Sequence, residues 1–216
     1  TTGNQNIAIG HNAINGGTTT GDNNIAIGVS AGDALTSGKN NLVVGKDAGG
    51  AINSGGSNTI IGHSAGDALT TGNDNTLVGT AAGGATIDSH HHVLIGYGAG
   101  GVGDIVANGA TAVGYQSLNA LTSGTKNTAI GYEAQKVQTT GERNTVIGYR
   151  AFYTADAGED YNTIIGSEAG YYINNDASHD NVLIGKNALQ GGTGTIKENI
   201  AIGSGTMNGV ASNSQT

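Results

Sequence analysis

The chain has 216 residues, a formal net charge of −8 and 40 glycines, but no proline, cysteine or tryptophan. Its eight lysine and arginine residues are scattered singly, and without a basic stripe the sequence argues against nucleic-acid binding. No apolar run approaches the roughly 18 residues that a membrane-spanning helix requires, so we expect no membrane insertion in this segment. Aromatic residues make up only 4% of the chain, which excludes a conventional thick core and favours thin coils packed with Ile, Val, Leu and Ala.

A five-residue pattern that ends in Ile-Gly or Val-Gly recurs along the whole chain, from Asn6–Gly10 to Asn199–Gly203. Ten of the copies begin with Asn, and the other two begin with His92 and Ala110. The twelve closing glycines are spaced 17, 18 or 19 residues apart: Gly10, Gly28, Gly45, Gly62, Gly79, Gly96, Gly114, Gly131, Gly148, Gly166, Gly185 and Gly203. A fixed period of this length is the signature of a stacked repeat architecture. The sequence therefore predicts an all-β parallel β-roll, or β-solenoid, of about twelve coils of 17–19 residues.

Each copy predicts a short strand with two apolar faces. Counted from the closing glycine as position 0, position −1 is always Ile or Val and position −2 is always apolar. Successive side chains of a strand point to opposite faces, so one apolar row fills the coil and the other faces outward. A soluble monomer rarely exposes such a strip. We therefore expect copies of the chain to cover it in a symmetric oligomer, although the pattern does not show which row points inward.

The remainder of each repeat predicts a corner, a second short strand and a turn. Position +3 is Ala in ten copies, with Ser117 and Thr206 in the other two, and an always-small residue indicates a sharp corner. A weaker apolar run such as 34–36 predicts the second strand, and a turn rich in Gly, Asn, Ser and Thr follows it. We interpret the leading Asn as a turn residue. A ladder of stacked Asn side chains is the less favoured alternative.

The repeats predict one continuous β-roll array over residues 1–207, followed by a polar linker or cap at 208–216. The first residues, 1–6, match the inter-repeat turn at 70–75. The array thus opens in the middle of a turn, and we expect the chain to be a segment of a longer fibre.

The motif Asn-x-Ala-Ile-Gly occurs at Asn24–Gly28, Asn127–Gly131 and Asn199–Gly203, with a small residue three positions after the glycine. This pattern resembles the head repeats of trimeric autotransporter adhesins (the YadA-like head), and similar repeats occur in bacteriophage tail fibres. The resemblance covers residues 4–207. It implies a left-handed parallel β-roll in a homotrimer, on an extracellular fibre that attaches to surfaces. The repeats here are a few residues longer than the family's compact repeat, which implies an extra excursion in each coil.

Two patterns that suggest a cofactor or a metal have simpler interpretations. Gly98–Gly103 fits a dinucleotide-binding fingerprint, but another strand repeat follows it where the fingerprint requires a helix. His90 and His92 would share a face of a strand, and a trimer axis could gather them into a metal site. An exposed turn, with His92 in the usual Asn position, is the favoured interpretation. We expect no bound cofactor, and His90 and His92 stay weak metal candidates.

No pattern predicts catalysis. Asp88–His90 contains the residue types of a catalytic triad, but adjacent residues cannot form its geometry. Glu133 and Glu168 occupy the same repeat position two coils apart, which predicts a separation of about 10 Å. That separation lies outside the range of retaining glycosidases. We expect no catalytic residue and no enzymatic activity.

Tyrosines are the best candidates for ligand or surface binding. Position +1 is Tyr in four consecutive repeats, and in-register stacking predicts a ladder with a spacing of about 4.8 Å. A tyrosine offers a flat apolar face and a polar tip, which suit sugars or proteins, although a row that only stabilises the roll or a trimer contact is the favoured alternative. Further tyrosines lie near the longest excursions, where recognition is common. The candidates are Tyr97, Tyr115, Tyr132, Tyr149, Tyr153, Tyr161, Tyr171 and Tyr172.

These observations predict a non-enzymatic, extracellular structural protein. The first hypothesis is an adhesin-type fibre segment on a bacterial cell surface, anchored at the outer membrane, which mediates cell adhesion through a host-surface glycan or protein. The second is a bacteriophage tail-fibre segment with a receptor-binding role on the virion. The third is a self-assembling structural filament. A homotrimer formed through the apolar strand face is the expected partner arrangement for the first two hypotheses.

Overall fold

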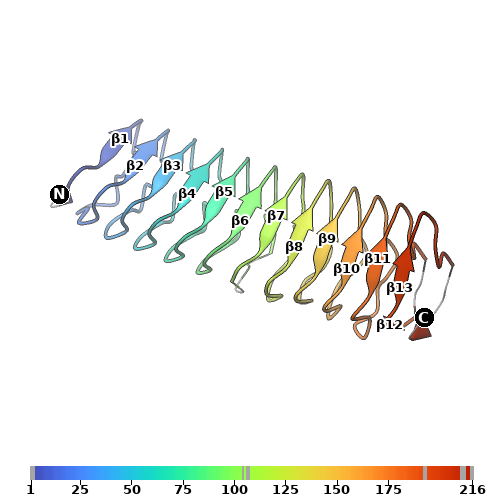
Figure 1. Cartoon of the computed structure of the whole chain (residues 1–216). Helices are drawn as coiled ribbons and strands as arrows, with labels where there is room; N and C mark the ends of the chain where they lie inside the picture. Colours follow the sequence, from blue (N-terminus) through green and yellow to red (C-terminus); the bar gives the residue numbers. More distant parts are fainter. Residues whose placement is uncertain (1–2, 104, 106–107, 192–193, 210–212, 215–216) are drawn as a thin grey trace. The chain divides into compact units, whose positions relative to one another are not determined.

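A computed structural model describes residues 3–103, 105, 108–191, 194–209 and 213–214. These residues form strands, turns and bends, and none of them lies in a helix. The chain divides into two compact units, unit 1 (1–109) and unit 2 (110–216). In each unit the chain winds through successive coils that place one short strand beside the next (Figure 1). The predicted all-β, parallel β-solenoid is confirmed.

Every closing pentapeptide that was predicted to hold a strand does so. Unit 1 contains β1 (Ile7–Ile9), β2 (Ile25–Ile27), β3 (Leu42–Val44), β4 (Thr59–Ile61), β5 (Thr76–Val78) and β6 (Val93–Ile95). Unit 2 contains β7 (Thr111–Val113), β8 (Thr128–Ile130), β9 (Thr145–Ile147), β10 (Thr163–Ile165), β11 (Val182–Ile184), β12 (Ile196–Lys197), β13 (Ile200–Ile202) and β14 (Asn213–Ser214). Most neighbouring strands pair in parallel with equivalent repeat positions opposite each other, as in Ile60↔Leu77.

The structure shows which apolar row points inward. Position −2 forms the core: Val43, Ile60 and Leu77 are almost completely buried. Position −1 faces outward, and Ile61 and Ile95 each keep 36% of their surface exposed. Sequence periodicity could not make this assignment, because a strand that is apolar on both faces has the same pattern in either orientation.

Some coils exchange side-chain size between positions −2 and +4 of the core. In β4 the large Ile60 accompanies Gly66 at position +4, where an added Cβ would come within 2.7 Å of Leu77 Cδ1. In β7 the small Ala112 accompanies Leu118, which is completely buried. A close-packed interior tolerates such exchanges when the total volume is kept. The exchange does not occur in every coil, since Val146 and Phe152 are both large and buried in the coil of β9.

The predicted second strand is not formed in the described runs that were expected to hold it. The run at 34–36 passes from a turn into a bend, although Leu35 in it is buried as expected. The cause lies in the corner before it, where alternate residues adopt positive φ, as at Ser30 (54°) and Gly32 (57°). Left-handed residues at every second position keep the chain from extending. The backbone still bonds to the next coil, for example from Thr36 N to Asn53 O at 3.1 Å.

The leading Asn forms a buried ladder, so our favoured interpretation of it as a turn residue was wrong. Asn58 Nδ2 donates to Asn41 Oδ1 at 3.0 Å and to Gly72 O at 2.9 Å, while Asn58 Oδ1 accepts from the backbone N and Nδ2 of Asn75. The left-handed turn residue is the one before it, such as Ser57 (φ 58°). The amide thus satisfies buried backbone groups of neighbouring coils, which would otherwise be costly to bury.

The structure describes only part of the predicted linker or cap at 208–216. Residues 213 and 214 form β14, which pairs in parallel with β12. The remainder of that prediction, at 210–212 and 215–216, lies outside the described residues. Among the described residues there is no helix long and apolar enough to cross a membrane.

Candidate functional site

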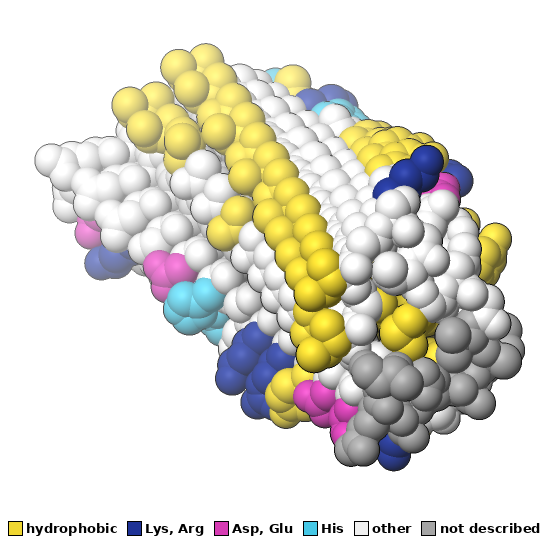
Figure 2. Space-filling view, turned by 45° about the vertical axis from the view of Figure 1, so that its right-hand side comes forward, with side chains coloured by type: hydrophobic (Ala, Val, Ile, Leu, Met, Phe, Trp, Pro, Cys, Tyr) yellow, Lys and Arg dark blue, Asp and Glu magenta, His cyan; other side chains and the backbone are white. Residues whose placement is uncertain are grey.

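The outward row at position −1 is the first candidate surface. Within unit 1 it runs through Ile9, Ile27, Val44, Ile61, Val78 and Ile95, and within unit 2 through Val113, Ile130, Ile147, Ile165, Ile184 and Ile202. We name this row the outer strip. In Figure 2 hydrophobic side chains form such a stripe, bordered by uncharged side chains and backbone. The in-register pairing of the strands produces it, because equivalent residues such as Val44 and Ile61 lie side by side.

A tyrosine ladder in unit 2 is the second candidate surface. Tyr115 and Tyr132 stack with ring centroids 4.9 Å apart and planes inclined by 9°, and Tyr132 and Tyr149 stack at 5.5 Å and 17°. Each ring remains about 40–45% exposed. The ladder predicted from position +1 is therefore formed by these three residues. Tyr97, the fourth member of the predicted row, belongs to unit 1, where 53% of its surface is exposed.

A second pair of stacked rings lies in the longer excursions. Tyr153 and Tyr171 both occupy position +5, and their rings stack at 5.2 Å and 9°. Tyr172 meets the edge of Tyr171 with centroids 4.6 Å apart and planes at 69°. Burial raises the pKa of Tyr171, so its hydroxyl stays protonated at neutral pH. The structure thus brings together three of the tyrosines predicted from the excursions.

Arg150 joins the two groups of rings. Its guanidinium carbon lies 5.4 Å from the centroids of both Tyr149 and Tyr153, and Lys136 Nζ lies 5.9 Å from the Tyr153 centroid. Distances below about 6 Å are those of cation–π contacts. We name the set Tyr115, Tyr132, Tyr149, Arg150, Tyr153, Tyr171 and Tyr172 the tyrosine surface. The sequence prediction missed Arg150, because only the register of the corners places it between rings from different repeat positions.

Glu133 holds both cations in place. Its Oε1 accepts from Lys136 Nζ at 2.7 Å, and its Oε2 accepts from Arg150 Nε at 2.7 Å. Burial raises the pKa of Glu133, but hydrogen bonds from Lys136 and Arg150 outweigh this effect, so the pKa lies below its ordinary value. Glu168, its predicted counterpart two coils away, accepts from Gln190 Nε2 at 2.9 Å instead. Glu133 is thus a neutralised carboxylate that positions two cations beside aromatic rings.

Tyr161 forms a separate group. Arg143 Nη1 donates to the Tyr161 hydroxyl, and its guanidinium carbon lies 5.1 Å from the ring centroid. Arg143 Nη1 also donates to Glu142 Oε1 at 2.8 Å. With 46% of its surface exposed, Tyr161 offers a second, smaller aromatic contact point.

The histidines predicted as weak metal ligands lie in different surroundings. Residues 90–92 precede β6 and do not form a strand, since His91 adopts a φ of 62°. His90 Nδ1 accepts from the backbone N of Asn73 at 2.9 Å. His92 is completely buried in the Asn position, and its backbone N donates to Asn75 Oδ1 at 3.0 Å. The expected shared strand face of His90 and His92 is therefore not formed.

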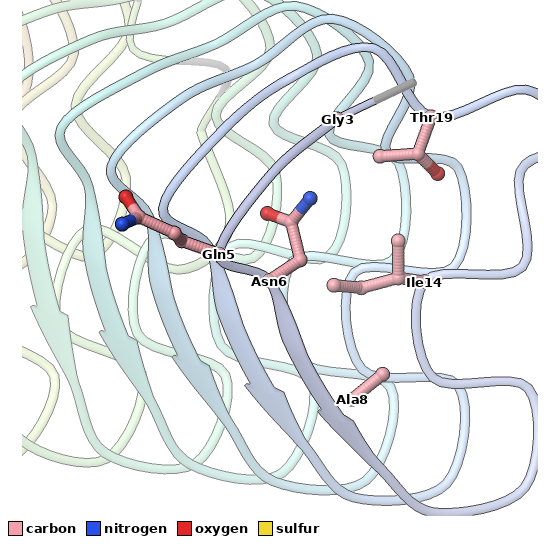
Figure 3. A pocket seen from close by; sticks show the side chains of 6 residues that line it. All are labelled: Gly3, Gln5, Asn6, Ala8, Ile14 and Thr19. Atoms are coloured by element: carbon pink, nitrogen blue, oxygen red, sulfur yellow. The ribbon is translucent and has the colours of Figure 1, made fainter. Parts of the chain in front are cut away.

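A pocket lies at the first coil of unit 1 (Figure 3). Gly3, Gln5, Asn6, Ala8, Ile14 and Thr19 line it. Ala8 is an inward-facing residue whose equivalents in later coils are buried, yet here it is exposed. The pocket is therefore the uncovered end of the coil interior, and no charged side chain lines it.

Comparison of the chain with protein-family models, curated proteins and solved structures found no match.

Proposed function

We propose that this chain is a segment of a homotrimeric, non-enzymatic extracellular fibre that presents a surface for attachment to host cells or other surfaces. The observation that carries the proposal is the outer strip. Its Ile and Val side chains point away from the coil interior, and several of them retain more than a third of their surface exposed. Contiguous apolar surface of this kind marks an interaction site.

A second copy of the strip is the partner that fits best. The strip contains only Ile and Val, and in Figure 2 uncharged side chains and backbone border the hydrophobic stripe along most of its length. Three strips that meet around a common axis would bury one another over the length of each unit, as in a closed symmetric oligomer. The resemblance of the repeats to trimeric adhesin heads favours three copies over two.

The tyrosine surface is the proposed attachment site. Stacked rings held at about 5 Å and flanked by Arg150 provide flat apolar faces, hydroxyl groups and a fixed positive charge. Aromatic and arginine side chains dominate the binding energy of many interfaces. A surface glycan or a protein loop would lie across the rings. A fibre with this role would be displayed on a bacterial cell surface or a virion.

Binding to immobilised glycans and to host-surface proteins tests the attachment role. We expect the double variant Tyr132→Ala and Tyr149→Ala to lose at least about tenfold in affinity for a ligand of the native chain, because each ring contributes an interface hot spot. Val29→Ala, which changes an exposed apolar residue at the same repeat position in unit 1, is the control and should bind normally. Unchanged binding by the double variant, with a preserved circular dichroism spectrum, would contradict the assignment.

The bacteriophage tail-fibre alternative shares the strip and the tyrosine surface and differs in what it attaches to. It would bind a bacterial receptor, whereas an adhesin would bind a host surface. Binding of the native chain to bacterial cells but not to host cells would favour the tail fibre. The reverse result would favour the adhesin.

A further inference from the structure

Three carboxylates meet in the two longest excursions of unit 2. Asp156 and Glu159 lie between β9 and β10, and Asp176 lies between β10 and β11. Each offers one oxygen, and the three oxygens lie within 4.8 Å of one another. Gly158 permits this approach: a Cβ added there would be 3.1 Å from both the Cβ and the carbonyl oxygen of Asp176. We name Asp156, Glu159 and Asp176 the carboxylate cluster.

Glu159 is the buried member of the cluster, and its carboxylate lacks a full set of hydrogen-bond partners. None of its surface is exposed, and its Oε1 has no hydrogen-bond partner among the described residues. Gln138 Nε2 lies 3.4 Å from the other oxygen, Oε2, and backbone N–H groups of Glu159 and Asn175 also favour the ionised form of the carboxyl group. A buried carboxylate oxygen without a donor is costly. Glu159 therefore contributes to the cluster a buried carboxylate with one unsatisfied oxygen.

The cluster has no ion-pair partner among the described lysine and arginine residues. Burial, reinforced by the charge of Asp156, raises the pKa of Glu159 to about 7. Asn174 lies against Asp156 and, with its amide turned to donate, its nitrogen is 2.5 Å from Oδ1 and 3.2 Å from Oδ2. Turned the other way, the same amide would present its carbonyl oxygen.

We propose that Asp156, Glu159 and Asp176 bind a calcium ion, with the side-chain carbonyl oxygen of Asn174 as a further ligand. All the available donors are oxygens, which calcium and magnesium prefer. Calcium takes six to eight oxygen ligands at 2.3–2.6 Å in flexible geometry, whereas magnesium requires a near-ideal octahedron. At these calcium–oxygen distances, two oxygens on opposite sides of the ion are about 5 Å apart. The spacing of the three carboxylate oxygens therefore fits a single ion. Asp156 and Asp176 are exposed, which leaves room for water to complete the coordination.

The ion would join the two excursions beside the tyrosine surface. Tyr153 and Tyr161 lie within a few residues of Asp156 and Glu159, and Tyr171 and Tyr172 precede Asp176 in the next coil. Calcium would therefore lock the loops that carry these rings, and it would replace the missing partner of Glu159. The inference does not depend on the attachment role, since the ion would stabilise the fold whether or not the rings bind a ligand.

Calcium titration of the chelator-treated chain tests the proposal, at pH 8 so that Glu159 is ionised. Isothermal titration calorimetry should show one calcium per chain, and the melting temperature should rise when calcium replaces a chelator. The absence of both effects would overturn the site. Equally tight binding of magnesium would overturn the assignment to calcium.

Two variants locate the ion. Glu159→Gln keeps the size of the buried side chain, and Asp176→Asn changes an exposed one, so both should fold while calcium affinity falls at least tenfold. Asp180→Asn is the matched control: it removes an exposed charge from the same excursion, outside the cluster, and should bind as the native chain does. Calcium affinity that is unchanged in Glu159→Gln and Asp176→Asn would show that the ion binds elsewhere, and the proposal would fail.

Discussion

At the scale of single residues, glycine and asparagine determine how neighbouring coils fit together. The closing glycines combine a positive φ near 140° with contact against the next coil, as at Gly62 (φ 144°). The leading asparagines connect neighbouring coils through side-chain hydrogen bonds. Both roles repeat once per coil, so each is tested by a change in a single coil.

Gly62→Ala is expected to destabilise unit 1 strongly. A Cβ there would lie 2.4 Å from Gly79 O and 2.6 Å from Gly79 C, and the φ is one that residues with a side chain avoid. We expect a loss of at least about 2 kcal/mol in the free energy of unfolding, measured by denaturant titration. Gly50→Ala is the control, because its Cβ would meet nothing closer than 3.6 Å. Equal stability of the two variants would contradict the close-approach argument.

Asn58→Ala tests the buried ladder. The change removes the acceptor of Asn75 N and Nδ2 and the donor to Asn41 Oδ1 and Gly72 O. Unsatisfied buried groups cost about 1–3 kcal/mol each, so we expect a loss of about 2–4 kcal/mol, read from the urea midpoint. Asn15→Ala, at an exposed position, should change stability little. A loss no larger than that of Asn15→Ala would show that the ladder contributes little.

Glu133 predicts a pH dependence of stability. Because its pKa is lowered in the folded state, its stabilising effect is fully present above the ordinary carboxyl range and disappears as the pH falls through the lowered pKa. The melting temperature of the native chain should therefore fall more steeply below pH 4.5 than that of Glu133→Gln. Parallel pH profiles of the two proteins would indicate that Lys136 and Arg150 do not stabilise the ionised form.

The asparagine and tyrosine rows show what a repeat reveals at this scale. The tyrosine ladder followed directly from a shared repeat position. The Asn ladder carried the same signal, a residue repeated in register at the start of a buried strand, but the turn preference of Asn suggested a simpler role. The pairing of Arg150 with Glu133 joins positions +2 of neighbouring corners, and only the coil geometry shows that these side chains meet near the rings.

At the scale of elements, the strand is the part that the sequence predicted best. All twelve pentapeptides form strands, because β-branched residues bounded by Asn and Gly have little alternative. The predicted second strand failed because left-handed residues such as Ser30 and Gly32 interrupt it. Several of these are non-glycine residues, including Leu118 (φ 47°) and Phe152 (φ 53°), so composition alone did not reveal the corner.

Ile61→Glu tests the outer strip as an interface. A charge at the centre of a strip that is covered by another copy would be desolvated, so the assembly should dissociate while each chain stays folded. Analytical ultracentrifugation should show a lower mass than for the native chain, with an unchanged circular dichroism spectrum. Ser54→Glu, at an exposed turn position, is the matched control. An unchanged mass for Ile61→Glu would place the interface elsewhere.

At the scale of the whole molecule, the fold and the assembly rest on different kinds of evidence. The solenoid follows from a period that the chain repeats twelve times, and the structure confirms it. The proposed trimer rests on an apolar row that a solenoid cannot bury within itself, together with the resemblance of the repeats to trimeric adhesin heads, and it stays a prediction. The proposed attachment site depends on side chains such as Tyr149 and Arg150, whose arrangement is specific to a few coils.

The mass of the native chain in solution tests the central claim most directly. Multi-angle light scattering should give three times the chain mass of 21.3 kDa, independent of concentration over the micromolar range. That result would support burial of the outer strip between copies and the fibre function that depends on it. A soluble monomer with the outer strip exposed would contradict the trimer and the proposed function with it.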